Sequence, residues 1–152
     1  MMQRTHLAIT LFFTILFLSV VEDKWIFVLF AVIGTYLPDV DSRYSKIGQR
    51  KIARILQWFT KHRGMIHSFT FLASLTVLLV VFFPPSAFGF FLGYGLHLFA
   101  DSFTKDGIRP FYPSTSSSSG KFKTGGLAEI GLFVAFVIAD VAVFFDKVLG
   151  VI

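Results

Sequence analysis

The sequence predicts an all-α integral membrane protein with about five transmembrane helices and a cytoplasmic amphipathic helix. Three observations predict this fold: a mean hydropathy of +0.73, a composition that is 55% hydrophobic and only 15% charged, and a series of apolar segments divided by short polar ones. Soluble domains rarely have such a composition. With 152 residues, the chain is expected to form a single membrane-embedded domain, residues 1–152.

The predicted helices follow the apolar segments, which cover residues 7–21, 25–37, 66–83, 86–100 and 127–145. Glu22 and Asp23 end the first segment, Pro38 the second, and Pro84 the third. Only the third and fifth approach the roughly 20 residues that cross a bilayer, so the others are expected to extend into polar flanks or to lie where the bilayer is thinner. The first segment could also be a signal peptide, but no small-x-small cleavage site follows it, which favours an uncleaved helix.

The distribution of basic residues predicts the orientation. With the N-terminus inside, the inner segments hold twelve of the 14 lysines and arginines, and only Lys24 and Lys147 lie outside. The inner residues are Arg4, Arg43, Lys46, Arg50, Lys51, Arg54, Lys61, Arg63, Lys105, Arg109, Lys121 and Lys123. Because cytoplasmic loops of membrane proteins carry an excess of Lys and Arg, the N-terminus is predicted to be cytoplasmic.

Two inner segments have a recognisable character. Apolar residues recur at helical spacing between residues 47 and 59, with basic residues elsewhere on the helix and Trp58 as an interfacial anchor. This pattern predicts an amphipathic helix on the cytoplasmic headgroups, although a soluble helix packed on the loop would also fit. Residues 114–120 are a serine-rich low-complexity stretch and are expected to form a mobile flap over the site.

Histidine and aspartate residues gather at the inner ends of the apolar segments. These residues are His6, Asp39, Asp41, His62, His67, His97 and Asp101. The chain has no cysteine, so a metal ion here would be held by imidazole and carboxylate groups. His97 and Asp101 are four residues apart, which places them on one helix face with Cβ atoms about 5–6 Å apart.

Each of these signals also has a simpler explanation. A single histidine in a membrane helix is more often a packing residue, and Asp39 and Asp41 could be turn-forming residues after a helix. However, two carboxylates one residue apart beside hydrocarbon repel each other unless a cation lies between them. Glu129, which begins the fifth segment on the same face, could be an ordinary first-turn acid favoured by the helix dipole.

Three motifs together resemble a known family. They are Leu37-Pro38-Asp39-Val40-Asp41-Ser42, His62-Arg63-Gly64-Met65-Ile66-His67-Ser68 and Gly93-Tyr94-Gly95-Leu96-His97-Leu98-Phe99-Ala100-Asp101-Ser102-Phe103-Thr104. They closely resemble the YdjM-like membrane-bound metal-dependent hydrolases of bacteria, as do Thr5-His6, the turn from Gly107 to Pro113, and Glu129. At Met65-Ile66 the family often has a small residue and Thr. The order of His and Asp residues is also similar to that of the zinc-dependent phospholipase C class.

The resemblance implies a metal-dependent hydrolase of the bacterial inner membrane that acts on phosphoesters or phospholipids at the cytoplasmic face. It implies that the seven His and Asp residues named above bind roughly one to three divalent ions, with Zn²⁺ favoured and Mn²⁺ or Fe²⁺ as alternatives. Asp41 or Glu129 is expected to be a general base or to orient a ligand histidine, and Arg63 and Lys105 are expected to hold the substrate phosphate.

Membrane lipids and a small-molecule or lipid substrate are the expected partners, and no nucleic acid is expected, because the basic residues lie beside apolar segments. The alternative function is that of a non-catalytic metal-binding membrane protein with a structural, regulatory or metal-handling role.

Overall fold

The computed structural model describes residues 1–41 and 65–149, and this part of the chain is all-helical. Its helices are α1 (Gln3–Phe17), α2 (Lys24–Tyr36), the short 3-10 helix η1 (Pro38–Asp41), α4 (Phe69–Phe82), α5 (Pro84–Ser102) and α6 (Leu127–Leu149). The described residues contain no strand, only two isolated backbone bridges in the segment after α5.

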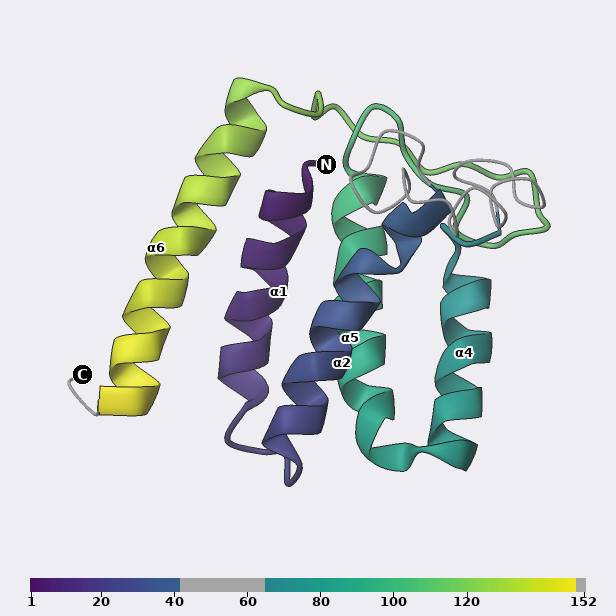
Figure 1. The fold of residues 1–152 in the computed structure, drawn as a ribbon. Helices are drawn as coiled ribbons and strands as arrows, with labels where there is room; N and C mark the ends of the chain where they lie inside the picture. The colour runs from purple at the N-terminus through teal and green to yellow at the C-terminus, as the bar shows by residue number, and fades with distance from the viewer. Residues whose placement is uncertain (42–64, 150–152) are drawn as a thin grey trace.

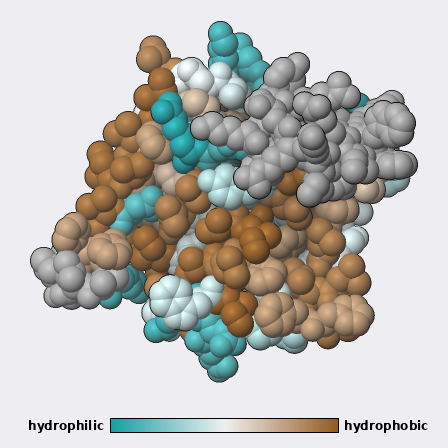
Figure 2. Space-filling view, in the orientation of Figure 1, coloured by the Kyte–Doolittle hydropathy of each residue, from teal (hydrophilic) through white to brown (hydrophobic). Residues whose placement is uncertain are grey.

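The long helices lie side by side and alternate in direction (Figure 1). The first residues of α1, α4 and α6 and the last residues of α2 and α5 meet at one end of the bundle, where residues 103–126 also lie. We call this the loop end. Hydrophobic residues cover the middle of the molecule, and hydrophilic residues appear toward its two ends (Figure 2).

One described helix is long and apolar enough to cross a membrane. The stretch Leu127–Lys147 of α6 has 21 residues, a mean hydropathy of 2.3 and only 6% of its apolar window buried in the fold. Helix α4 is apolar but shorter. The all-helical prediction is therefore confirmed for the described residues, whereas the number of membrane spans stays a prediction.

The helix bounds differ from the apolar segments in ways that matter for the site. Helix α1 begins at Gln3, so His6 lies inside the helix and not before it. Pro84 does not simply end the preceding helix; it begins α5, since the first helical position needs no N–H donor. Helix α4 begins at Phe69 because the Ser68 hydroxyl caps it by accepting a hydrogen bond from Phe71 N at 3.2 Å. The predicted amphipathic helix lies outside the described residues.

Small residues bring α2 and α5 into close contact. A Cβ atom added at Gly93 would lie 1.9 Å from the Ala31 carbonyl oxygen, and one added at Gly89 would lie 2.3 Å from the Phe27 carbonyl oxygen. Such four-residue spacing of glycines lets helix backbones approach closely in membranes. The approach places the last turns of α5 beside the C-terminal half of α2, and this fixes the geometry of the site.

Candidate metal centre

Helix α5 supplies two residues of the site from the same face that packs on α2. His97 and Asp101 continue the four-residue spacing of Gly89 and Gly93, so all four lie along one side of the helix. Both side chains are almost fully buried, with 0% of His97 and 3% of Asp101 exposed. The distance from His97 Nε2 to Asp101 Oδ2 is 3.8 Å.

A backbone carbonyl on α2 fixes the orientation of the His97 ring. His97 Nδ1 lies 2.8 Å from the Thr35 carbonyl oxygen, and since a carbonyl can only accept, Nδ1 carries the proton and donates it. The other nitrogen, Nε2, therefore presents a lone pair to the site. Among the described residues this buried atom has no hydrogen-bond partner. A histidine whose second nitrogen is anchored on a carbonyl is typical of metal ligation.

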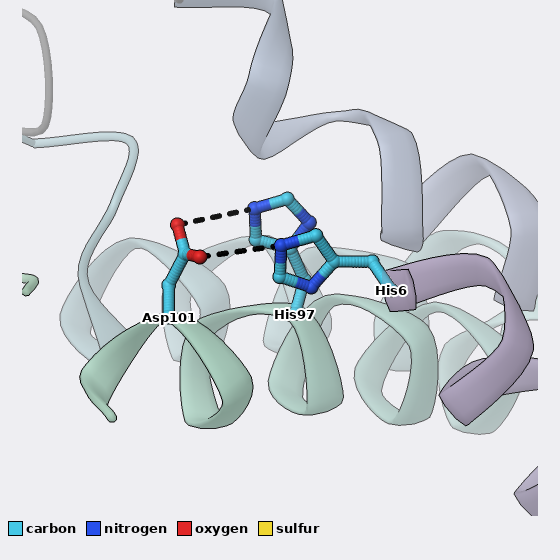
Figure 3. Close-up of side chains that lie close together, drawn as sticks. All are labelled: His6, His97 and Asp101. Carbon is cyan, nitrogen blue, oxygen red and sulfur yellow. Dashed lines mark ion pairs between the residues drawn. The ribbon is translucent and has the colours of Figure 1, made fainter. Parts of the chain in front are cut away.

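Helix α1 contributes His6. Its ring stacks on that of His97, with centroids 3.8 Å apart and planes 10° from parallel. His6 Nε2 lies 3.2 Å from Asp101 Oδ1, as Figure 3 shows together with the His97–Asp101 contact. Imidazole groups from two helices thus approach the two oxygens of one buried carboxylate.

His67 and Asp39 complete the cluster. Asp39 lies in η1 with its Oδ1 atom 3.9 Å from His97 Nε2, and His67 Nε2 lies 3.9 Å from Asp101 Oδ2. The donor atoms form two groups, each with all atoms within 4.8 Å of one another: His6, His97 and Asp101, and Asp39, His67 and His97. Since His97 belongs to both, the groups form one cluster of five residues.

The turn that carries His67 is held by a buried tyrosine on α5. The Tyr94 hydroxyl donates to the carbonyl of Ile66 at 2.5 Å, one residue before His67, and Tyr94 is 0% exposed. Its ring packs in the apolar cluster between α4 and α5 that includes Leu72 and Leu98. The position of His67 therefore depends on the packing of these two helices.

The cluster fits a divalent cation. Ligand atoms at roughly 2.0–2.1 Å from a tetrahedral ion lie about 3.3 Å apart, and the pairwise contacts here are 3.2 to 3.9 Å. These four distances cover part of the cluster, and in each group all donor atoms lie within 4.8 Å of one another. A set of nitrogen and oxygen donors without sulfur suits Zn²⁺, Mn²⁺ or Fe²⁺. Burial raises the pKa of Asp39 above its ordinary value, although the charges of His6 and His67 oppose this rise. A bound cation would offset the cost of burying two carboxylates together.

Glu129 lies outside this cluster and binds backbone groups. The side chain is 1% exposed; its Oε1 atom accepts from Met2 N at 2.5 Å, and its Oε2 atom accepts from Gly125 N at 2.6 Å. It thus links the start of α6 to the start of α1, four residues before His6. The amino group of Met1 contacts Asp101 Oδ1.

The sequence predicts four other site residues. Lys105 is exposed in the segment after α5, and the backbone of Asp41 ends η1. His62 and Arg63 lie outside the described residues.

The sequence analysis assigned no role in the site to Thr35, to Tyr94 or to the glycines of α5, although Gly93 and Tyr94 are part of a motif quoted there. No sequence signal could identify Thr35, since it acts through a backbone carbonyl that every residue has. The glycines could have been found, because Gly89 and Gly93 lead at steps of four residues to His97 and Asp101.

The chain is similar to known bacterial proteins. Residues 1–149 match the family described as YdjM inner membrane protein. Inner membrane protein YdjM of Escherichia coli (strain K12) is 35% identical over 108 residues, which cover 60% of this chain and 51% of the relative, and the protein of that name from Shigella flexneri gives the same values. An uncharacterized protein of Bacillus subtilis (strain 168), YvsG, is 28% identical over 87 residues, covering 55% of this chain and 54% of the relative.

The chain spans about half the length of the curated relatives that it matches. No solved structure matches it.

Proposed function

We propose that this chain, which belongs to the YdjM inner membrane protein family, is a metal-dependent hydrolase that acts on phosphoesters or phospholipids at the cytoplasmic face of the bacterial inner membrane. One observation carries the proposal: His6, Asp39, His67 and the α5 pair His97 and Asp101 come from four separate segments, and their donor atoms converge in a largely buried cluster. A lone buried carboxylate is costly, whereas a cluster of this composition is suited to a divalent ion.

The proposed topology has five spans and a cytoplasmic N-terminus. It is supported by the alternating direction of the long helices and by the meeting of their motif-bearing ends at the loop end (Figure 1). The excess of lysine and arginine in the segments assigned to that side also supports it. In this arrangement His62 would join the five clustered residues as a further ligand.

Zn²⁺ is the proposed ion, and when bound it would supply Lewis acidity that polarises a phosphoryl oxygen and acidifies water. The chain's own residues have separate roles. Thr35 holds His97 in the tautomer that leaves Nε2 free to bind a cation. Lys105 and Arg63 would hold the substrate phosphate.

Asp41 and Glu129 were the two candidates for a general base or for a residue that orients a ligand histidine. The contacts of Glu129 favour the orienting role, because both of its carboxylate oxygens accept backbone hydrogen bonds. By holding Met2 it fixes the first turn of α1, from which His6 projects. We therefore propose Asp41 as the general base and Glu129 as a positioning residue.

The proposal is tested by measuring the metal content of the purified protein and its turnover on a panel of phospholipids and soluble phosphoesters. We expect bound zinc and hydrolysis in the wild type, with both lost in His97→Ala. Asp106→Asn is the matched control, since Asp106 is an exposed carboxylate in the segment after α5. Absence of metal from the wild type after incubation with Zn²⁺, Mn²⁺ and Fe²⁺ would refute the proposal.

The low solvent exposure of the clustered histidines supports a second candidate function. In this alternative the chain is a non-catalytic metal-binding membrane protein with a structural, regulatory or metal-handling role. The side chains of His6 and His97 are only 1% and 0% exposed, and closed sites are typical of structural metals. Stoichiometric metal with no turnover on any member of the panel, and loss of heat stability on chelation, would favour this function over hydrolysis.

A further inference from the structure

We propose that residues 103–124 form a platform that binds the headgroups of anionic phospholipids. This inference goes beyond the proposed hydrolysis and does not depend on it. The segment lies across the loop end of the bundle (Figure 1), where the hydrophobic cover of the helices gives way to hydrophilic residues (Figure 2). If the helices cross a membrane, a segment at this end of the bundle would lie at the level of the lipid headgroups.

Backbone hydrogen bonds give the platform a defined shape. Ile108 and Ser118 exchange both N–H···O bonds at 2.9 Å, and Lys105 N donates to the Phe122 carbonyl at 2.9 Å. Gly107 permits the close approach, because it has a φ of +63° and a Cβ there would lie 2.3 Å from the Ser118 carbonyl oxygen. Ser118, within the serine-rich stretch expected to be a flap, is therefore tied to the residues that follow α5.

The platform exposes aromatic side chains. Phe111 is 65% exposed and Phe103, Tyr112 and Phe122 are each more than a third exposed. Several exposed aromatic rings in one short segment are unfavourable in water, whereas aromatic residues are enriched at the interface between membrane and water. These rings therefore favour contact with lipid over contact with bulk solvent.

The charges on the platform are complementary to anionic lipid. Its basic residues, Lys105, Arg109, Lys121 and Lys123, are all exposed. The only acidic residue in the segment is Asp106, which accepts a hydrogen bond from the Thr124 hydroxyl at 3.3 Å. A phospholipid phosphodiester offers the opposite charge, and its acyl chains lie beside the exposed rings. Free phosphate offers only the charge, so the combination favours a lipid.

The test measures dissociation constants of the purified protein for dioleoylphosphatidylglycerol and dioleoylphosphatidylcholine in a neutral detergent, by native mass spectrometry of the first lipid adduct. The variant carries Arg109→Gln, Lys121→Gln and Lys123→Gln together and keeps Lys105, the candidate substrate ligand. Each basic residue near an anionic surface contributes about fivefold to binding. We expect the triple variant to bind phosphatidylglycerol at least tenfold more weakly, with little change for phosphatidylcholine.

Two further variants make the result specific. Lys24→Gln with Lys147→Gln removes the two basic residues predicted to lie on the other side of the membrane and should leave phosphatidylglycerol binding unchanged. Phe111→Ser keeps all the charges and should weaken lipid binding severalfold. Equal phosphatidylglycerol binding by the triple variant and the wild type would overturn the proposal. Displacement of the lipid by millimolar inorganic phosphate, with no effect of Phe111→Ser, would show a free-phosphate site and would also overturn it.

Discussion

Replacing Gly93 with alanine should weaken metal binding without touching a metal ligand. The added Cβ would lie 1.9 Å from the Ala31 carbonyl oxygen, 2.8 Å from its carbon and 3.0 Å from Thr35 Oγ1. Carbon and carbonyl oxygen do not approach closer than about 3.3 Å, so the two backbones must separate locally by roughly 1.4 Å. Two of these three contacts are backbone atoms of α2, which cannot move aside alone.

The displacement reaches the site through Thr35. This residue follows Ala31 by one helical turn, and its hydroxyl donates to the Ala31 carbonyl at 2.8 Å, so it moves with Ala31. The hydrogen bond from His97 Nδ1 to the Thr35 carbonyl, now 2.8 Å long, would then exceed the range of a hydrogen bond. Overpacking costs about 1–3 kcal/mol of stability, and loss of a partner that orients a ligand histidine lowers metal affinity roughly 10–100-fold.

Zinc affinity is measured in detergent by competition with a chromogenic chelator. The melting temperature of the metal-free protein is measured in parallel. Gly95→Ala is the matched control on the same helix, since its Cβ would make an ordinary contact of 3.6 Å with Leu72. We expect the Gly93→Ala variant to bind zinc at least tenfold more weakly than Gly95→Ala. Equal affinities for the two variants would refute the link between helix packing and the site.

Three further predictions concern the ligands, Glu129 and the topology. Replacing His97 or Asp101 with alanine should remove the metal and lower the melting temperature in parallel, because metal binding contributes folding free energy; wild-type metal stoichiometry in both variants would exclude the pair as ligands. Glu129→Gln turns an acceptor toward a backbone N–H into a donor, so we expect reduced thermal stability and weaker metal binding. Unchanged stability and metal content, with hydrolysis slowed by roughly 10²–10⁴-fold, would instead make Glu129 the general base. A single cysteine at Ser117, in a chain that has none of its own, should resist impermeant thiol reagents added outside intact cells; efficient labelling would reverse the topology.

The sequence alone predicted which residues could meet. Hydropathy marked the helical segments, since helices satisfy their own backbone groups inside apolar surroundings. The direction of successive segments then placed His6, His67 and Asp101 at one end, and the spacing of four put His97 beside Asp101. These inferences depend on the spacing of residues within one helix and on the alternating direction of successive helices, and both can be predicted from the sequence.

The helix ends were harder to predict, because they depend on single capping contacts. Ser68 caps α4, which begins at Phe69, three residues after the start of the apolar segment. Pro84 opens α5 two residues before the apolar segment 86–100 that the sequence assigned to this helix. The role of Glu129 was equally open, since a first-turn carboxylate can bind a metal, a proton or a backbone amide. Its hydrogen bonds join Gly125, four residues earlier in the chain, to Met2, 127 residues earlier.

Only the tertiary structure decided how the site is oriented. The distance between α2 and α5 is set by Gly93 against Ala31, residues more than sixty positions apart, and that distance brings the Thr35 carbonyl to His97. The spacing of Gly89 and Gly93 in α5 favours a close approach of another helix, but it does not identify Ala31 and Thr35 as the residues that are approached. The sequence therefore determined the set of candidate ligands. Packing between distant segments determined which nitrogen of His97 faces the cluster, because the orientation of the ring depends on a hydrogen bond across the helix interface.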